Sequence, residues 1–158
     1  MLAPLKPKIY AGSDHAGYSL RGRVVAHLRE RGYEVEDLGA HTTESTDYPD
    51  YAAAVGRAVR EHPGSLGVLA CGTGMGVCMA ANKVRGIRGA PVWSLESARL
   101  ARAHNDANVL CLGARLTPES EALALVDKWL ETPFEGERHQ RRIEKVAALE
   151  KQECELTK

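Results

Sequence analysis

A glycine-rich segment that begins with a cysteine is the sharpest chemical signal in the sequence. The segment Cys71 to Gly76 (CGTGMG) follows a short apolar run, Leu66 to Ala70, and precedes a helical pattern. Closely spaced glycines let backbone N–H groups converge on a small concavity, which favours an anion or a developing oxyanion. A thiol beside a helix N-terminus favours the thiolate, so Cys71 can serve as a base or a nucleophile. The same pattern is equally typical of a buried cysteine that ends a strand before a tight turn.

Three other groups of side chains suit acid–base chemistry or phosphate binding. Asp14 and His15 follow the first apolar run; an adjacent acid and imidazole can share proton transfer, and an Asp here equally suits a helix N-cap. His104 ends a helical pattern, where a histidine often serves only the helix dipole. Arg138 and Arg142 lie four residues apart on one helix face, where guanidinium groups either hold a phosphate or form a solvated charged face.

The elements that must position these groups alternate between strand and helix. Short apolar runs separated by single amphipathic helices predict a three-layer, Rossmann-like α/β fold, in which a five-stranded parallel sheet carries helices on both faces. Strands are expected at residues 8–13, 33–38, 66–70, 86–93 and 108–113. Ligands of such sheets bind beyond the carboxyl ends of the strands. This rule predicts a site built from residues 13–15, residues 71–76, the loop after Trp93 and residues 113–115.

Helix-start signals refine this expectation. Ser94 suits the N-cap of a helix that runs to about His104. Thr117 suits the N-cap of the next helix, with Pro118 at its first helical position. A polar last helix from about Glu137 carries a narrow apolar stripe, and we expect it to extend into a dimer.

Composition bounds the class of protein. The 158 residues predict a flexible lead (1–7), a single domain (8–149) and a C-terminal tail (150–158). The 21 basic and 21 acidic side chains cancel, which argues against bulk nucleic-acid binding. No apolar run approaches the roughly 20 residues of a membrane span, so no membrane partner is expected. Four cysteines without a Cys-x-x-Cys pair, and the absence of a signal-peptide pattern, indicate reduced thiols, no zinc site and a cytoplasmic location.

Eight short motifs, in order, resemble the type B ribose-5-phosphate isomerases, within the sugar-phosphate isomerase family that also contains the galactose-6-phosphate isomerase subunits. The resemblance runs from about Lys8 to about Leu149. The motifs are Ser13–Gly17, Thr46–Pro49, Cys71–Gly76, Ala80–Lys83, Gly86–Arg88, His104–Asn108, Gly113–Arg115 and Arg138–Arg142.

The resemblance implies interconversion of ribose 5-phosphate and ribulose 5-phosphate, a step of the non-oxidative pentose phosphate pathway. It implies ring opening and an enediolate intermediate, with no cofactor and no metal. It also implies a homodimer, or a larger assembly such as a tetramer, in which each site is shared by two subunits.

The resemblance also assigns roles to single residues. Cys71 matches the base that moves the proton between C1 and C2, and Thr73 matches a part of the loop around the enediolate oxygens. His104 matches the acid that opens the sugar ring, and Asp14 matches a partner of the ring oxygen or a hydroxyl. One branch of the family uses a Glu just beyond the loop; Val77 stands there, so this chain follows the cysteine branch. The expected substrate-binding residues are His15, Gly72, Gly74, Met75, Gly76, Asn105, Arg115, Arg138 and Arg142.

Three alternatives remain open on sequence grounds. The same site accepts a six-carbon sugar phosphate, such as allose 6-phosphate or galactose 6-phosphate, if the phosphate-binding arginines lie one carbon further away. The glycine loop also suits a non-catalytic nucleotide- or phosphate-binding module. A thiol redox protein is the weakest alternative, since Cys78 is the one evident resolving cysteine.

Overall fold

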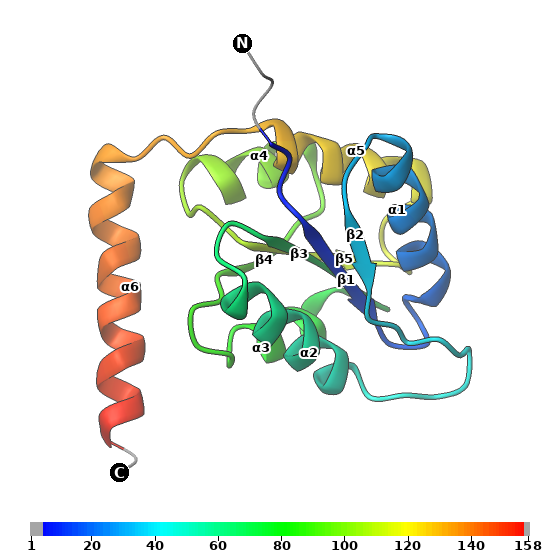
Figure 1. The fold of residues 1–158 in the computed structure, drawn as a ribbon, viewed down its shortest axis with the longest axis horizontal. Helices are drawn as coiled ribbons and strands as arrows, with labels where there is room; N and C mark the ends of the chain where they lie inside the picture. Colours follow the sequence, from blue (N-terminus) through cyan, green and yellow to red (C-terminus); the bar gives the residue numbers. More distant parts are fainter. Residues whose placement is uncertain (1–4, 157–158) are drawn as a thin grey trace.

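The five strands form one parallel sheet, as the sequence predicts, and their order in the sheet is β2-β1-β3-β5-β4 (Figure 1). The computed structural model describes residues 5–156; residues 1–4 of the predicted lead and 157–158 of the predicted tail lie outside the described residues. The strands are β1 (Ile9–Ser13), β2 (Val35–Asp37), β3 (Leu66–Cys71), β4 (Gly89–Pro91) and β5 (Val109–Gly113). Ser13 pairs with Ala70, and Cys71 pairs with Gly113, so the carboxyl ends of β1, β3 and β5 meet at one edge.

Helices cover both faces of the sheet, which confirms the three-layer architecture. One face carries α1 (Tyr18–Glu30), α4 (Leu95–Ala103) and α5 (Glu119–Glu131); the other carries α2 (Tyr48–Glu61) and α3 (Met75–Ala81). Successive residues of a strand point to opposite faces: on β5, Leu110 and Leu112 pack on the first layer, while Val109 and Cys111 pack on the second. A strand buried on both sides needs apolar residues at every position, which explains the apolar runs without alternation.

Two element boundaries show how local chemistry decides where helices begin. Ser94 caps α4 as predicted: its Oγ accepts the N–H of Ser97 at 3.1 Å, and the Ser97 Oγ accepts the N–H of Ser94 at 3.0 Å. The predicted cap at Thr117 is wrong, because Pro118 has an extended ψ of 146° and itself occupies the N-cap position. The N–H of Thr117 instead donates to the Gly113 carbonyl at 3.0 Å, within the turn that follows β5.

The last helix, α6 (Glu137–Leu156), lies to one side of the sheet, at the left in Figure 1. It runs unbroken across residues 149–150, where the sequence predicts the tail to begin. Ile143 and Val146 line cavities between α6 and the β4 segment, and the Glu150 carboxylate accepts the Gly86 N–H at 3.1 Å. Within residues 5–156, no helix combines the length and apolarity that crossing a bilayer requires.

Candidate active site

Cys71 ends β3 at the carboxyl edge of the sheet. Its side chain is buried, and its Sγ accepts the backbone N–H of Gly74 at 3.1 Å. This contact anchors the sulfur at the start of α3, inside the turn that leads from strand to helix. The glycine loop therefore wraps around the thiol, as the spacing of its residues predicts.

Close backbone packing explains two of the glycines around the loop. Gly74 has φ +79°, in the left-handed region that favours glycine, and a Cβ there would lie 3.0 Å from the Leu112 carbonyl carbon. A Cβ on Gly113 would lie 2.6 Å from the Thr73 carbonyl oxygen. The loop thus lies directly on the end of β5, and side chains at these positions would push it away.

Asp14 and His15 lie at the same edge, after β1. The buried Asp14 accepts the Gly17 N–H through Oδ1 at 3.0 Å, within the turn before α1. The N-cap of α1 is Gly17, which has no side-chain cap, so the alternative that Asp14 is the N-cap is wrong. The Nδ1 of His15 lies 3.1 Å from the N–H nitrogen of Thr46 and 3.3 Å from the Thr46 carbonyl oxygen. The N–H of His15 also donates to the Thr46 Oγ1 at 3.0 Å. Thr46 therefore fixes the orientation of this ring.

Arg115 completes the set at this edge. Its backbone N–H donates to the Gly72 carbonyl at 2.9 Å, and a Cβ on Gly72 would lie 2.9 Å from the Arg115 Nη1. The guanidinium therefore lies over the glycine loop. We call Asp14, His15, residues 71–76 and Arg115 the carboxyl-edge group; the structure brings them together, as the strand-end rule predicts.

Tyr48 also reaches the loop, although sequence reasoning assigned it no role. A Cβ on Gly76 would lie 2.8 Å from the Tyr48 ring, so that ring lies against the first turn of α3. Thr46 and Tyr48 belong to one of the family-like motifs, which was the available signal. Their contacts with His15 and Gly76 join distant parts of the chain, and spacing alone cannot reveal such contacts.

His104 lies at the opposite edge of the sheet. It caps the C-terminus of α4, which runs back toward the amino end of β5. The five residues of β5 separate its two ends by about 13 Å at the usual rise per residue. Arg138 follows at the start of α6, whose first turn packs on His104 through His139. We call His104, Asn105, Arg138 and Arg142 the amino-edge group; a single chain does not bring it to Cys71.

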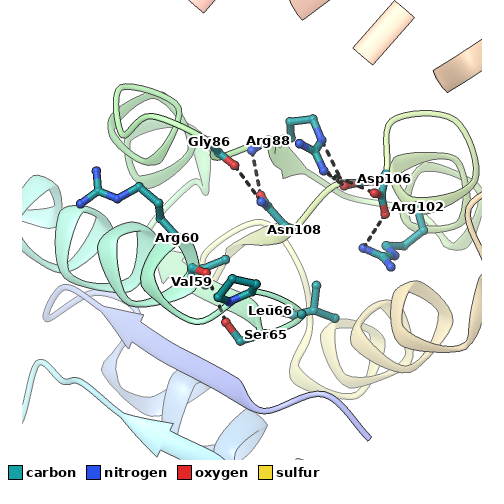
Figure 2. A pocket seen from close by; sticks show the side chains of 11 residues that line it. Val59, Arg60, Ser65, Leu66, Gly86, Arg88, Arg102, Asp106 and Asn108 are labelled. Carbon is teal, nitrogen blue, oxygen red and sulfur yellow. Dashed lines mark hydrogen bonds and ion pairs between the residues drawn. The ribbon is translucent and has the colours of Figure 1, made fainter. Parts of the chain in front are cut away.

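Three charged or polar side chains hold the turn that follows His104 (Figure 2). Arg88 donates to the carbonyls of Asn105 at 3.1 Å and Asp106 at 2.9 Å, and Arg102 donates to the Ala107 carbonyl at 2.8 Å. The Asn108 amide bridges the Arg88 N–H and the Gly86 carbonyl. These side chains line a pocket of ≈ 450 Å³ at the amino edge. Burial lowers the pKa of Arg102, and the carboxylate of Asp106 opposes this effect.

Within residues 5–156, one cluster brings three potential metal ligands together: His104, Glu135 and His139 have ligand atoms within 4.8 Å of one another. The two imidazole rings are stacked, with centroids 4.1 Å apart and an interplanar angle of 14°. A metal ion lies in the plane of each imidazole that binds it. Two stacked, nearly parallel rings lie in separate planes, so one ion cannot lie in the plane of both. The donor types suit a divalent cation, but the ring geometry does not.

Two further buried thiols lie near Cys71 in the same part of the core. The Cys78 thiol interacts with Cys111, which lowers the pKa of Cys78. That interaction and burial raise the pKa of Cys111 well above its usual value. No disulfide bond links the cysteines of residues 5–156.

Comparison with known proteins gives the same family at the level of sequence and of structure. The family model described as Ribose/Galactose Isomerase matches residues 9–146. Ribose-5-phosphate isomerase B of Escherichia coli is 48% identical over 143 residues, which cover 90% of this chain and 96% of that protein. The solved structure of Clostridium thermocellum ribose-5-phosphate isomerase B has a TM-score of 0.90 at 47% identity, covering 92% of this chain and 98% of the other. The Mycoplasma genitalium structure, with bound ribulose-5-phosphate, has a TM-score of 0.89 at 46% identity, covering 91% and 96%.

Proposed function

The chain belongs to the ribose/galactose isomerase family, and on this premise we propose that it interconverts ribose 5-phosphate and ribulose 5-phosphate. The observation that carries the proposal is the similarity, over nine-tenths of the chain, to an isomerase whose structure contains ribulose-5-phosphate. The carboxyl-edge group supplies side chains of the types that this reaction needs. The aldose–ketose step is a proton transfer between C1 and C2, and it changes no oxidation state overall.

Cys71 is the base of this proposal. Its thiolate removes the proton from C2 of the open-chain aldose and returns it to C1 by way of an enediolate, while a proton moves from the C2 hydroxyl to the C1 oxygen. The glycine loop with Thr73 surrounds the oxygens on which negative charge develops, and backbone N–H groups at a helix start suit that charge. The contact of Sγ with the Gly74 N–H supports this role, because it holds the sulfur inside the loop.

Ring opening precedes this step, because ribose 5-phosphate is mainly a furanose. His104 donates the proton to the ring oxygen, and Asp14 binds the ring oxygen or a hydroxyl. Asn105 contacts the substrate beside His104. The phosphate is held by His15, Arg115, Arg138 and Arg142, and this binding energy positions the reacting carbons.

These roles require two chains, so we propose a homodimer with shared sites, alone or within a larger assembly. The argument rests on the opposite edges occupied by Cys71 and His104 in one chain. Exposed apolar side chains beside the loop support it: Met75, Trp93 and Leu116 are 56%, 71% and 63% exposed, and they line a pocket of ≈ 240 Å³. Such a patch is typical of a surface that another chain covers.

The test is the isomerisation rate of chelator-treated protein on ribose 5-phosphate beside allose 6-phosphate. We expect rapid turnover of the pentose phosphate and slow turnover of the hexose phosphate. Faster turnover of the hexose phosphate than of the pentose phosphate would identify a hexose phosphate as the substrate. No turnover of either compound would contradict the proposal and favour a phosphate-binding module, which a thermal-shift screen with nucleotides would then detect.

A further inference from the structure

His104 rests on a second histidine that the proposed reaction does not use. The ring of His139, from the first turn of α6, stacks on the His104 ring at a centroid distance of 4.1 Å. His139 is 5% exposed and is the one buried side chain of α6 within the described residues. Its Nε2 makes no hydrogen bond with residues 5–156. The contact that His139 makes with His104 is therefore through the face of its ring and not through a hydrogen bond of its Nε2.

The linker before α6 is fixed to the same place. The N–H of Glu135 donates to the Ala103 carbonyl at 3.0 Å, which ties the linker to the end of α4. The Glu135 carboxylate lies 3.7 Å from the His104 Nε2 and 3.6 Å from the His139 Nε2. Burial lowers the pKa of His139, and the charges of His104 and Arg138 add to this effect.

We infer that His139 is a positioning residue for His104, whose imidazole it holds in one plane by stacking. The inference rests on the proposed role of His104 in ring opening. The side chain of His104 is 35% exposed and its Nε2 lies 3.7 Å from the Glu135 carboxylate, so stacking on one face restrains the plane of a ring that is otherwise approached only at its edge. A general acid must meet the ring oxygen at a defined angle, and a small misplacement costs a large factor in rate. Because His139 adjoins Arg138, the acid and a phosphate-binding arginine form one rigid unit.

Two assays together distinguish a defect at His104 from a loss of folding, because only one of the two reactions needs ring opening. In ribulose 5-phosphate the C5 oxygen carries the phosphate, so the ketone at C2 cannot close a five-membered ring. Exchange of its C1 proton with solvent therefore needs the base but no ring opening. Consumption of ribose 5-phosphate needs both steps. A defect confined to His104 slows the second process and spares the first.

The experiment uses the full chain and compares His139→Ala, which removes the platform, with His139→Phe, which keeps a flat ring. For His139→Ala we expect kcat on ribose 5-phosphate to fall about tenfold with KM within about twofold. Exchange at C1 of ribulose 5-phosphate in D₂O should stay within about twofold of wild type, and His139→Phe should stay within about threefold in both assays. An NMR signal of the His104 ring should lose its ring-current shift in His139→Ala and keep it in His139→Phe.

Three results would overturn the inference. Parallel loss of exchange and turnover in His139→Ala would show a general structural role. A His139→Phe variant as slow as His139→Ala would show that the nitrogens matter. An unchanged His104 signal in His139→Ala would show that the stack is absent in solution, and this outcome leaves the proposed function intact. Failure of wild-type turnover would overturn the proposed function, and this role with it, even where the ring-current shift is present.

Discussion

The carboxyl-edge and amino-edge groups are built by different means. Backbone holds the first: Gly74 donates to the Cys71 sulfur, and the loop lies directly on the end of β5. Side chains hold the amino-edge group: the Arg88 guanidinium hydrogen-bonds to the turn after His104, and His139 stacks on the His104 ring. Backbone contacts thus fix the loop at the carboxyl edge, while side-chain contacts fix the turn at the amino edge. In the proposed dimer, proton transfer at carbon belongs to the first group, and ring opening and part of the phosphate clamp belong to the second.

Loss of Cys71 should have the largest effect, because its thiolate is the base of the proposed proton transfer. Cys71→Ala should abolish both isomerisation and C1 exchange while keeping sugar-phosphate binding, measured by calorimetry. Cys78→Ala is the matched control, since it removes a similarly buried thiol from the same core cluster and should retain most activity. Normal turnover of Cys71→Ala at matched folding would remove this thiol from the mechanism.

Substitution in the glycine loop (residues 71–76) should have the next largest effect on kcat. Gly74→Ala places a Cβ at φ +79° and 3.0 Å from the Leu112 carbonyl carbon, which costs about 2 kcal/mol and shifts the loop. We expect a fall in kcat of about a hundredfold, because the oxyanion-binding amides move. Gly22→Ala, at an exposed position of α1 where a Cβ meets nothing within 4 Å, should be neutral or slightly stabilising. Equal activity of the two variants would contradict the account of the loop.

The arginines of the amino-edge group should affect KM rather than kcat. Arg142→Ala removes an exposed guanidinium that we assign to the substrate phosphate, and KM should rise about tenfold with little change in kcat. Arg141→Ala alters the neighbouring exposed arginine, which has no assigned contact, and it should leave KM unchanged. Steady-state kinetics on both variants decide the point. A KM unaffected by Arg142→Ala would exclude this arginine from the clamp.

The smallest effect concerns stability and pH. Burial, with the charges of His104, Arg138 and Arg142, lowers the pKa of His139 in the folded chain, and Glu135 acts in the opposite direction. The unfolded chain therefore binds this proton more readily, and stability should fall as pH drops through roughly 6.5. His139→Phe lacks this contribution, so its urea midpoint should fall less between about pH 7 and pH 5 than that of wild type. An equal fall in the two proteins would show that His139 titrates normally.

The sequence predicts the sheet and the carboxyl-edge group well, for a physical reason. Parallel strands bring their carboxyl ends together, so Asp14, Cys71 and Arg115 meet whatever the details of the loops. Strand β4 is shorter than predicted, since it pairs with β5 alone and ends at Pro91, which lacks an N–H. The cap at Thr117 failed because the conformation of Pro118 decides where α5 begins.

Tertiary contacts account for what the sequence could not supply. Thr46 and His15 are in contact although they lie 31 residues apart in the sequence. The stacking of His139 on His104 depends on the path of the linker before α6. The resemblance gave His104 and Cys71 roles in one site. Only the topology reveals that they lie at opposite edges of the sheet in a single chain, which gives the proposed sharing of sites between chains a geometric reason.

The most direct test of this account is complementation between two inactive variants. Cys71→Ala and His104→Asn are unfolded together, refolded as a mixture and assayed on ribose 5-phosphate. If each site combines the carboxyl-edge group of one chain with the amino-edge group of another, mixed dimers hold one intact site, and about a quarter of wild-type activity returns at equal mixing. Each variant refolded alone should stay inactive. A mixture no more active than its components would show that Cys71 and His104 serve the same chain's site, and would contradict the shared arrangement.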